Sequence, residues 1–264
     1  MLVFKGHAYG NDFLLAPASD ASGDRGGLAR AVCHRHHGVG ADGLIFYELR
    51  PRAATMSLFN ADGSRSELSG NGLRCLAALV ARKDSLVPGD VVTVATADGE
   101  KALEVLEQEG ERWTFRAAMG QPVGIREVKI PVLGEVITAS VLTMGNPQCV
   151  IIGPLPDAER FARLGPALST HAMFAAGTNV EFASVEGPDR VRILIWERGV
   201  GPTTSSGTGA SASAVAAAAH AGAGRRVDVV APGGTQRVEW RTDGVYLTGW
   251  AEIVLEGRWM GKGA

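Results

Sequence analysis

The sequence predicts an α+β protein built from two similar halves. Short segments that are β-branched, or that alternate between apolar and polar residues, outnumber segments with a helical pattern. Two serine–glycine turns also lie 137 residues apart, and each of them opens an alanine-rich helical pattern: Ser69-Gly70-Asn71-Gly72 and Ser206-Gly207-Thr208-Gly209. Each half runs through strands, a glycine-rich loop, this turn, a helix and further strands. This shared order indicates an internal duplication with pseudo-twofold symmetry.

The expected elements follow the same order in both halves. In the first half, we expect strands at 2–5, 12–16, 43–48, 54–60, 91–97 and 111–118, with helices at 27–37 and 71–82. In the second half, we expect strands at 136–143, 149–152, 180–185, 190–196, 226–230, 235–241 and 245–254, with helices at 158–169 and 207–223. The stretch 118–128 carries the weakest pattern, so the domain boundary is placed there.

Composition excludes several classes of protein. The chain has 264 residues, 45% of them hydrophobic, which is enough for one large domain or two of average size. A net charge of −2 without long runs of one sign argues against nucleic acid or an anionic membrane as partner. Neither a signal peptide nor a membrane span is evident. Three widely spaced cysteines do not suggest a disulfide framework. We therefore expect a cytoplasmic protein with reduced thiols.

The two serine–glycine turns are the strongest candidates for chemistry. A helix N-terminus presents unpaired N–H groups and partial positive charge, which suit a carboxylate or a developing anion. For one such serine taken alone, capping of the helix is the default interpretation. Two matching turns, together with glycines that cluster in short loop motifs, instead suggest one small-molecule site shared by the two halves.

Four further motifs accompany these turns along the chain. They are His7-Ala8-Tyr9-Gly10-Asn11-Asp12-Phe13, Gly38-Val39-Gly40-Ala41-Asp42-Gly43, Met144-Gly145-Asn146-Pro147 and Thr178-Asn179-Val180-Glu181-Phe182. With the two turns, they make the chain resemble the diaminopimelate epimerase family over nearly its whole length. Members of that family are cofactor-independent amino-acid epimerases of lysine and cell-wall biosynthesis.

The resemblance implies a fold and a division into domains. Each domain would be a curved, mainly antiparallel sheet around a central helix, and the site would lie in the cleft between the domains. The N-terminal domain would span 1–118 and would be joined by a C-terminal strand at 252–264, while the C-terminal domain would span 119–251. The resemblance implies no cofactor and a small-molecule amino-acid substrate, and we leave a homodimer open.

The resemblance also implies a mechanism in which two groups act on opposite faces of the substrate Cα. One group removes the α-proton and the other returns a proton, while the helix N-termini stabilise the carbanion. Ser69 and Ser206 occupy the positions of the two family cysteines, and Glu197 matches a glutamate near the reacting centre. The remaining candidates would bind substrate: Asn11, Asn60, Gly70, Asn71, Asn146, Asn179, Arg198, Gly207 and Thr208. Arginine suits bidentate binding of a carboxylate, and asparagine can meet both ammonium and carboxylate groups.

The chain departs from the family pattern where proton transfer is concerned. A cysteine thiol has a pKa of ~8.5, whereas a serine hydroxyl lies nearer the ~15.7 of water. This difference of roughly 7 pKa units means that forming the serine alkoxide costs on the order of 10 kcal/mol more than forming a thiolate. A helix terminus stabilises an anion by only about 0.3–2 kcal/mol. Serine therefore needs a neighbouring base. Gln148 stands where the family usually has histidine, and Pro202 stands where it commonly has glutamate.

Several alternatives stay open at this stage. The chain is expected to be an epimerase, but a racemase, dehydratase or isomerase of the same superfamily, acting on another amino or hydroxy acid, fits the motifs. So does a non-catalytic relative that binds an amino acid. The cluster His34-Arg35-His36-His37 lacks the cysteines or carboxylates that would complete a metal shell, so no metal is expected. Cys75 is expected to be a core residue.

Overall fold

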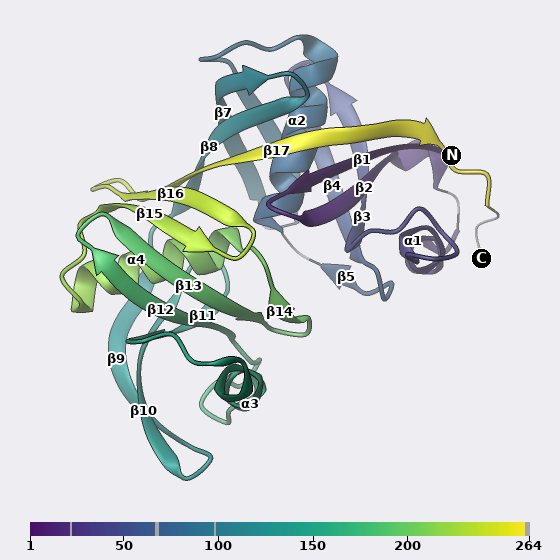
Figure 1. Ribbon diagram of the computed structural model, residues 1–264. Coiled ribbons are helices and arrows are strands. Elements are labelled where there is room, and N and C mark those ends of the chain that lie inside the picture. Colours follow the sequence, from purple (N-terminus) through teal and green to yellow (C-terminus); the bar gives the residue numbers. More distant parts are fainter. Residues whose placement is uncertain (22, 67–68, 98, 262–264) are drawn as a thin grey trace. The chain divides into compact units, whose positions relative to one another are not determined.

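The computed structural model describes residues 1–21, 23–66, 69–97 and 99–261 (Figure 1). The chain forms two compact units: unit 1 comprises Met1–Ala117 and Gly249–Ala264, and unit 2 comprises Ala118–Thr248. The domain limits 1–118, 119–251 and 252–264 stay a prediction. Among the described residues, no helix combines the length and apolar character that crossing a membrane requires.

In its described residues, unit 1 is a mainly antiparallel sheet that is accompanied by α-helices. Its strands are β1 (Leu2–Ala8), β2 (Asn11–Pro17), β3 (Gly43–Arg50), β4 (Ala53–Asn60), β5 (Arg65–Ser66), β6 (Val91–Thr96), β7 (Gly99–Glu109) and β8 (Arg112–Gly120), of which the last runs on into unit 2. Its helices are the short 3₁₀ turn η1 (Ala18–Asp20), α1 (Arg25–Cys33) and α2 (Gly70–Asp84). Among the described residues, β2 pairs in parallel with β3, and β4 with β6.

Unit 2 repeats this order of elements. Its strands are β9 (Val123–Val132), β10 (Glu135–Thr143), β11 (Pro147–Ile152), β12 (Asn179–Gly187), β13 (Arg190–Glu197), β14 (Gly201–Thr203), β15 (Arg226–Ala231) and β16 (Gly234–Trp240). Its helices are α3 (Ala158–Ser169) and α4 (Gly207–His220). The parallel pairs correspond to those of unit 1. Strand β11 pairs with β12 as β2 does with β3, and β13 pairs with β15 as β4 does with β6.

Like β8, the last strand has residues in both units. The first residues of β17 (Val245–Arg258) pair with β16 in unit 2, and its later residues, from Glu252 to Arg258, pair antiparallel with β1 in unit 1. In unit 2, β9 pairs with β10, the strand that corresponds to β1. The corresponding strands and parallel pairs confirm the predicted class, in which two similar α+β halves contain mainly antiparallel strands.

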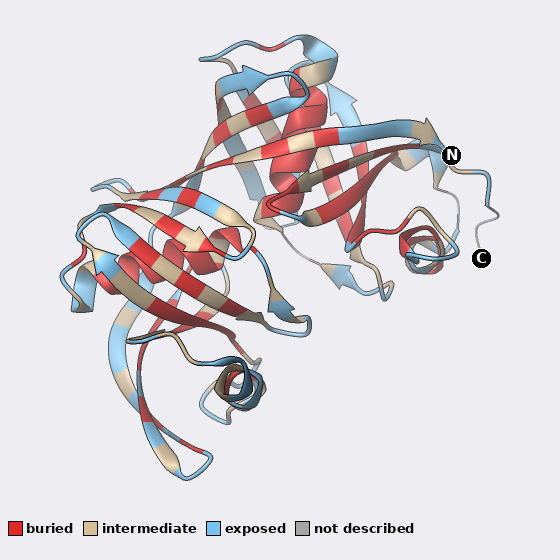
Figure 2. Cartoon of the chain, viewed as in Figure 1, coloured by how far each residue is buried: buried red, intermediate tan, exposed pale blue. Residues whose placement is uncertain are grey.

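A buried helix forms the core of each unit. Helix α2 packs on strands β1, β2, β3, β4, β6 and β7, and α4 packs on β10, β11, β12, β13, β15 and β16. Figure 2 shows both helices as mostly buried. Alanine and serine occupy most of α4 from Ala210 to Ala217, and such small side chains let the surrounding strands approach its backbone. Cys75 is fully buried in α2, as predicted.

The structure corrects some predicted elements. The stretch that was expected to be least regular contains the start of β9, where the consecutive exposed residues Arg126 and Glu127 interrupt the alternation that identifies a strand. Strand β7 was not predicted for a similar reason. Helix α1 ends at Cys33 rather than at residue 37. Helix α4 ends at His220 rather than at Ala223, because Gly222 adopts a positive φ of 72° and terminates it.

Candidate active site

The first candidate group lies at the start of α2 in unit 1. Ser69 is the N-cap residue of this helix, and its Oγ accepts a hydrogen bond from the backbone N–H of Gly72 at 3.1 Å. The predicted residues Gly70 and Asn71 form the first turn of the helix, where backbone N–H groups have no partner within the helix. The expected capping turn therefore exists, and it points the partial positive end of α2 toward Ser69.

A chain of amide hydrogen bonds leads from this turn to the neighbouring loops. Asn71 is buried, and its Nδ2 donates to Asn11 Oδ1 at 3.0 Å, while Asn11 Nδ2 donates to Asp42 Oδ2 at 2.7 Å. The buried Arg74 guanidinium donates to Asn71 Oδ1. Two predicted residues, Asn11 and Asn71, are thus brought together. The Asn60 side chain makes a different hydrogen bond, in which its Nδ2 donates to Ser64 Oγ within a turn.

The second candidate group repeats the capping geometry in unit 2. Ser206 is the N-cap residue of α4, and its Oγ accepts from the backbone N–H of Gly209 at 3.1 Å. Gly207 and Thr208 form the first turn, as Gly70 and Asn71 do in α2. The preceding loop is held in place by Gln236 of β16, whose Nε2 donates to Ser205 Oγ at 3.1 Å.

Polar side chains of β11 and β12 lie next to the first turn of α4. Ser206 Oγ and Thr208 Oγ1 are 3.4 Å apart. Thr208 Oγ1 in turn lies 3.2 Å from the side-chain amide of Gln148, a buried residue of β11. The same amide lies 3.0 and 3.2 Å from the two carboxylate oxygens of Glu181 on β12, which is fully buried. The structure therefore connects Ser206 to a buried carboxyl group.

The remaining predicted residues of unit 2 surround this group. Gln148 Nε2 donates to Asn146 Oδ1 at 2.6 Å. Asn179, at the start of β12, accepts the Arg198 backbone N–H on its Oδ1 at 2.9 Å. Its buried Nδ2 has no protein partner among the described residues. A buried donor without a partner is costly, so Asn179 is well suited to bind an acceptor on a ligand.

Arg198 and Glu197 follow one another at the end of β13. Arg198 is exposed, and one of its guanidinium nitrogens donates to the Ala176 carbonyl at 2.8 Å. Within the described ranges no carboxylate forms an ion pair with it, which leaves a cation suited to a substrate carboxylate. Glu197 is half-buried, and its charge acts on the carboxyl group of Glu181.

Burial dominates the electrostatics of Glu181. Removal from water raises the pKa of this carboxyl well above its usual range, and the charge of Glu197 raises it further. A protonated Glu181 can donate a hydrogen bond, whereas an ionised one can only accept. Gln148, which replaces the expected histidine, does not titrate. Glu181 is thus a titratable group that is linked to Ser206 through hydrogen-bonding side chains.

Comparison with known proteins agrees with this pattern. The sequence matches the model of the family described as diaminopimelate epimerase over residues 3–125 and 140–254. The chain belongs to the diaminopimelate epimerase family. It is 43% identical to the diaminopimelate epimerase of Desulforudis audaxviator, over 97% of this chain and 98% of that protein. It is 38% identical to the one from Pelotomaculum thermopropionicum, over 97% of each.

Solved structures show the same fold at much lower identity. A predicted epimerase from Pseudomonas aeruginosa superposes with a TM-score of 0.74 at 16% identity, and the match covers 99% of both chains. A hydroxyproline epimerase from Agrobacterium vitis has a TM-score of 0.72 at 16% identity, over 97% of this chain and 91% of the other. These similarities support the fold that the diaminopimelate epimerase family model indicates.

Sequence reasoning assigned no role to Glu181 or Arg74. Glu181 stands inside a quoted motif and Arg74 lies two residues after the first serine–glycine turn, and both are charged residues within otherwise apolar stretches that become fully buried. An acid between Val180 and Phe182 in a buried strand is a signal that could have been noticed, because unpaired buried charges are costly. Which groups face Glu181, however, depends on β11 and α4, which lie elsewhere in the sequence.

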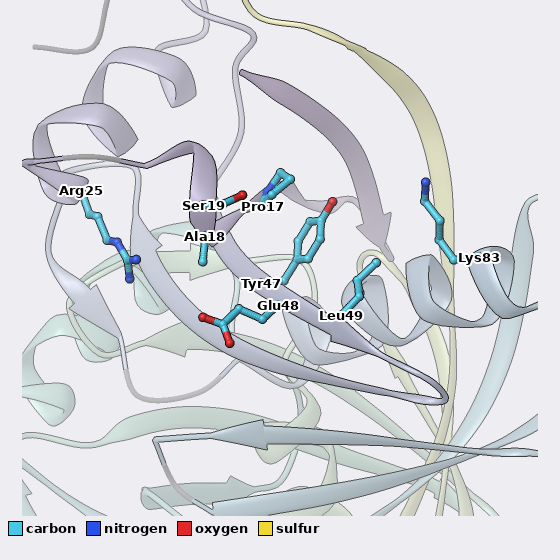
Figure 3. A pocket seen from close by; sticks show the side chains of 8 residues that line it. All are labelled: Pro17, Ala18, Ser19, Arg25, Tyr47, Glu48, Leu49 and Lys83. Atoms are coloured by element: carbon cyan, nitrogen blue, oxygen red, sulfur yellow. The ribbon is translucent and has the colours of Figure 1, made fainter.

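Two other features of the surface contain none of the predicted site residues. An open hollow of about 560 Å³ in unit 1 is lined by Pro17, Ala18, Ser19, Arg25, Tyr47, Glu48, Leu49 and Lys83 (Figure 3). The rings of His34 and His37 stack with centroids 4.5 Å apart on the surface. Within the residues that the structure describes, no group of three or more His, Cys, Asp or Glu side chains is arranged to hold a metal ion.

Proposed function

We propose that this chain is a cofactor-independent amino-acid epimerase that interconverts LL- and meso-diaminopimelate. The observation that carries the proposal is the duplicated serine cap. Ser69 and Ser206 each begin the buried helix of one unit, and each accepts a backbone N–H at 3.1 Å. Relatives that share 33–43% of the sequence carry the name diaminopimelate epimerase. The activity would place the chain in lysine and peptidoglycan biosynthesis.

In the proposed reaction, one serine removes the α-proton and the other returns a proton. Each capping N–H donates to the serine oxygen, and this favours the anionic form of the hydroxyl. Glu197 assists at the Ser206 position. The first-turn residues Gly70, Asn71, Gly207 and Thr208 would bind the α-carboxylate. The distal end of the substrate would be bound by Asn11, Asn60, Asn146, Asn179 and Arg198.

The chemistry of serine sets an expectation for the rate. One hydrogen bond to a charged oxygen contributes about 1.5–3 kcal/mol, and the helix terminus contributes about 0.3–2 kcal/mol. Together these fall short of the roughly 10 kcal/mol that separates a serine from a cysteine as a base. We therefore expect slow turnover by this chain and faster turnover when both serines are replaced by cysteine.

Hydrogen exchange at the substrate Cα tests the proposal directly. The protein is incubated in D2O with LL- or meso-diaminopimelate, deuteration is followed by NMR, and configuration is followed by chiral chromatography. We expect exchange with inversion, and an increase of at least tenfold in the Ser69→Cys/Ser206→Cys double variant. A Ser184→Cys variant, altered at a half-buried strand position, serves as the control. Binding without exchange in both the natural chain and the double variant would contradict the proposal.

A second candidate function is the binding of an amino acid without turnover. Two observations favour it: each serine hydroxyl accepts a capping hydrogen bond, and the neutral Gln148 occupies the position of the expected histidine. A binding protein would show calorimetric affinity for diaminopimelate but no Cα deuteration. Loss of water from a hydroxy acid would instead support a dehydratase of the same superfamily.

Two finer properties remain part of the proposal. We propose that the chain acts in the cytoplasm, because the expected activity belongs to amino-acid biosynthesis. We also propose a homodimer, which size-exclusion chromatography with light scattering tests. A monomeric mass across the micromolar range would exclude the dimer.

A further inference from the structure

The amide of Gln148 lies between the carboxyl group of Glu181 and the hydroxyl of Thr208. Odd-numbered positions of β12 face α4: Ala183 packs in the same core as the alanines of that helix, and Glu181 points to the first turn. Even-numbered positions, such as Phe182, pack in the core next to α3. This alternation buries the Glu181 carboxyl group, whose contacts include the Gln148 amide.

Two orientations of the Gln148 amide fit these surroundings. In one, the nitrogen donates to Asn146 Oδ1 at 2.6 Å, and the oxygen faces the carboxyl group of Glu181. This orientation requires a proton on Glu181, because two acceptors would otherwise face each other. In the other, the nitrogen donates to the two Glu181 oxygens at 3.0 and 3.2 Å, and the oxygen accepts from Thr208 at 3.2 Å. The Asn146 amide turns as well, because its Oδ1 would otherwise face the Gln148 oxygen at 2.6 Å. This orientation fits an ionised carboxylate.

The amide orientation determines the direction of the hydrogen bond between Thr208 and Ser206. When Glu181 is protonated, the Gln148 nitrogen faces Thr208 Oγ1, so the threonine proton is free to point to Ser206 Oγ at 3.4 Å. The proton of Ser206 can then point to a substrate. When Glu181 is ionised, Thr208 donates to Gln148 and accepts from Ser206. A lone pair of Ser206 can then face the substrate proton.

The surroundings of Glu181 allow it to carry a proton at higher pH than an exposed glutamate. Burial is the main cause of its raised pKa, and the charge of Glu197 on β13 adds to it. Among the described residues, a further titratable neighbour is Cys149 on β11, whose thiol has its pKa raised to about 12 and stays neutral below that. The first turn of α4 presents Ser206, Thr208 and Gly209, which do not titrate.

We propose that Glu181 is a positioning residue whose protonation sets the orientation of the Gln148 amide and, through Thr208, the hydrogen-bond direction at Ser206. The proposal rests on the proposed function insofar as it gives Ser206 a role in proton transfer. No proton passes through the amide, and no covalent bond forms or breaks. The protonation state of Glu181 determines whether the Ser206 hydroxyl presents its proton or an oxygen lone pair to the substrate.

The first test follows two side chains in the unliganded protein by NMR. The carboxyl carbon of Glu181 is assigned by its loss in Glu181→Gln, and the side-chain amide of Gln148 by its loss in Gln148→Met. We expect both signals to change with pH at one shared midpoint, which lies above that of an exposed glutamate. A Gln148 signal that does not follow the Glu181 titration would overturn the proposal. Glu186→Gln, an exposed position on the same strand, should leave both signals unchanged.

The second test measures the link to position 206 with a Ser206→Cys variant. Its thiolate is followed by ultraviolet absorbance, and the native thiols do not interfere, because the pKa of each is raised by burial to about 12: Cys33, Cys75 and Cys149. Adding Glu181→Gln keeps position 181 neutral and supplies a donor to the Gln148 oxygen, the arrangement that leaves the Thr208 proton for the sulfur. Loss of the Glu181 charge acts in the same direction, so the Gln148→Met variant below, which retains that charge, separates the two causes. We expect the thiolate midpoint to fall by about one pH unit. Equal midpoints would overturn the link.

A second variant covers the case in which Glu181→Gln does not fold. Gln148→Met in the Ser206→Cys background removes the acceptor that competes for the Thr208 proton, so the midpoint should again fall. An unchanged midpoint would count against the proposal. Neither titration depends on turnover. If the midpoints shift as expected but the substrate Cα does not exchange, the inference about Glu181 stands and the epimerase proposal is rejected. If the Cα exchanges but the midpoints do not shift, the epimerase proposal stands and the inference about Glu181 is rejected.

Discussion

Glu181 Oε1 lies 2.6 Å from the position that a Cβ on Gly209 would occupy, so β12 and the first turn of α4 approach more closely than an alanine permits. The same Cβ would stand 3.2 Å from Cβ and Oγ of Ser206. Glycine at this position thus allows a buried carboxyl group to lie against the helix that carries Ser206. The predictions below follow from this contact and from the hydrogen bonds around it.

Gly209→Ala should destabilise the protein and displace Glu181. Overpacking of a buried contact costs about 1–3 kcal/mol of unfolding free energy, measured by urea titration. Gly187→Ala is the matched control, since its added Cβ would meet only Asp189 Oδ1, at an ordinary 3.7 Å. An equal loss in both variants would show that the approach of Glu181 is not the cause.

The two serine caps should contribute similar amounts to stability. Ser69→Ala and Ser206→Ala each remove the acceptor of one first-turn N–H, and each should lower the unfolding free energy by about 1 kcal/mol. Ser184→Ala, in strand β12, should change it by less than about 0.5 kcal/mol. Chemical denaturation of the three variants tests this. If Ser206→Ala has the same unfolding free energy as the natural chain, the capping hydrogen bond does not stabilise the protein.

Asp12 should contribute to the loss of stability in acid. Its carboxyl is nearly buried, and although burial acts to raise its pKa, ion pairs with Arg35 and Lys5, each at 2.9 Å, hold that pKa below its usual value. A depressed pKa in the folded state gives stability that is present above the unfolded pKa of about 3.9 and disappears as the pH falls through the folded pKa.

The Asp12→Asn variant tests this sign. Its deficit in unfolding free energy relative to the natural chain should be largest near neutral pH and should shrink as the pH falls below about 4, followed by urea titration at several pH values. Glu107→Gln, at an exposed position of β7, should show no such trend. A deficit that is constant with pH would contradict the assignment.

Asn179→Asp should separate ligand binding from folding. The change preserves the oxygen that accepts the Arg198 N–H at 2.9 Å and removes the buried Nδ2 donor. If this donor binds a substrate carboxylate, diaminopimelate affinity should fall at least tenfold, because a hydrogen bond to a charged group contributes about 1.5–3 kcal/mol. Calorimetry measures the affinity and urea titration the stability. Unchanged affinity would remove Asn179 from the site.

Local sequence signals were sufficient for part of the fold and of the site. The alternation of apolar residues identified strands such as β4 and β13, whereas β9 was missed because the consecutive charged residues Arg126 and Glu127 interrupt its alternation. The capping role of Ser69 and Ser206 could be predicted, because a cap depends only on a serine and the next three residues. The positions of Asn11 and Asn60 could not be predicted in the same way. One joins the hydrogen bonds of the α2 turn, and the other bonds within its own turn.

The sequence by itself determined that two capped, alanine-rich helices recur in two similar halves, because periodicity and capping are properties of short segments. Only the tertiary structure decided that Ser206 has an acid nearby. Glu181, Gln148 and Thr208 come from β12, β11 and α4, and their contacts exist because these elements pack together around a glycine. Burial then raises the pKa of Glu181, and burial is a property of the folded chain rather than of any segment.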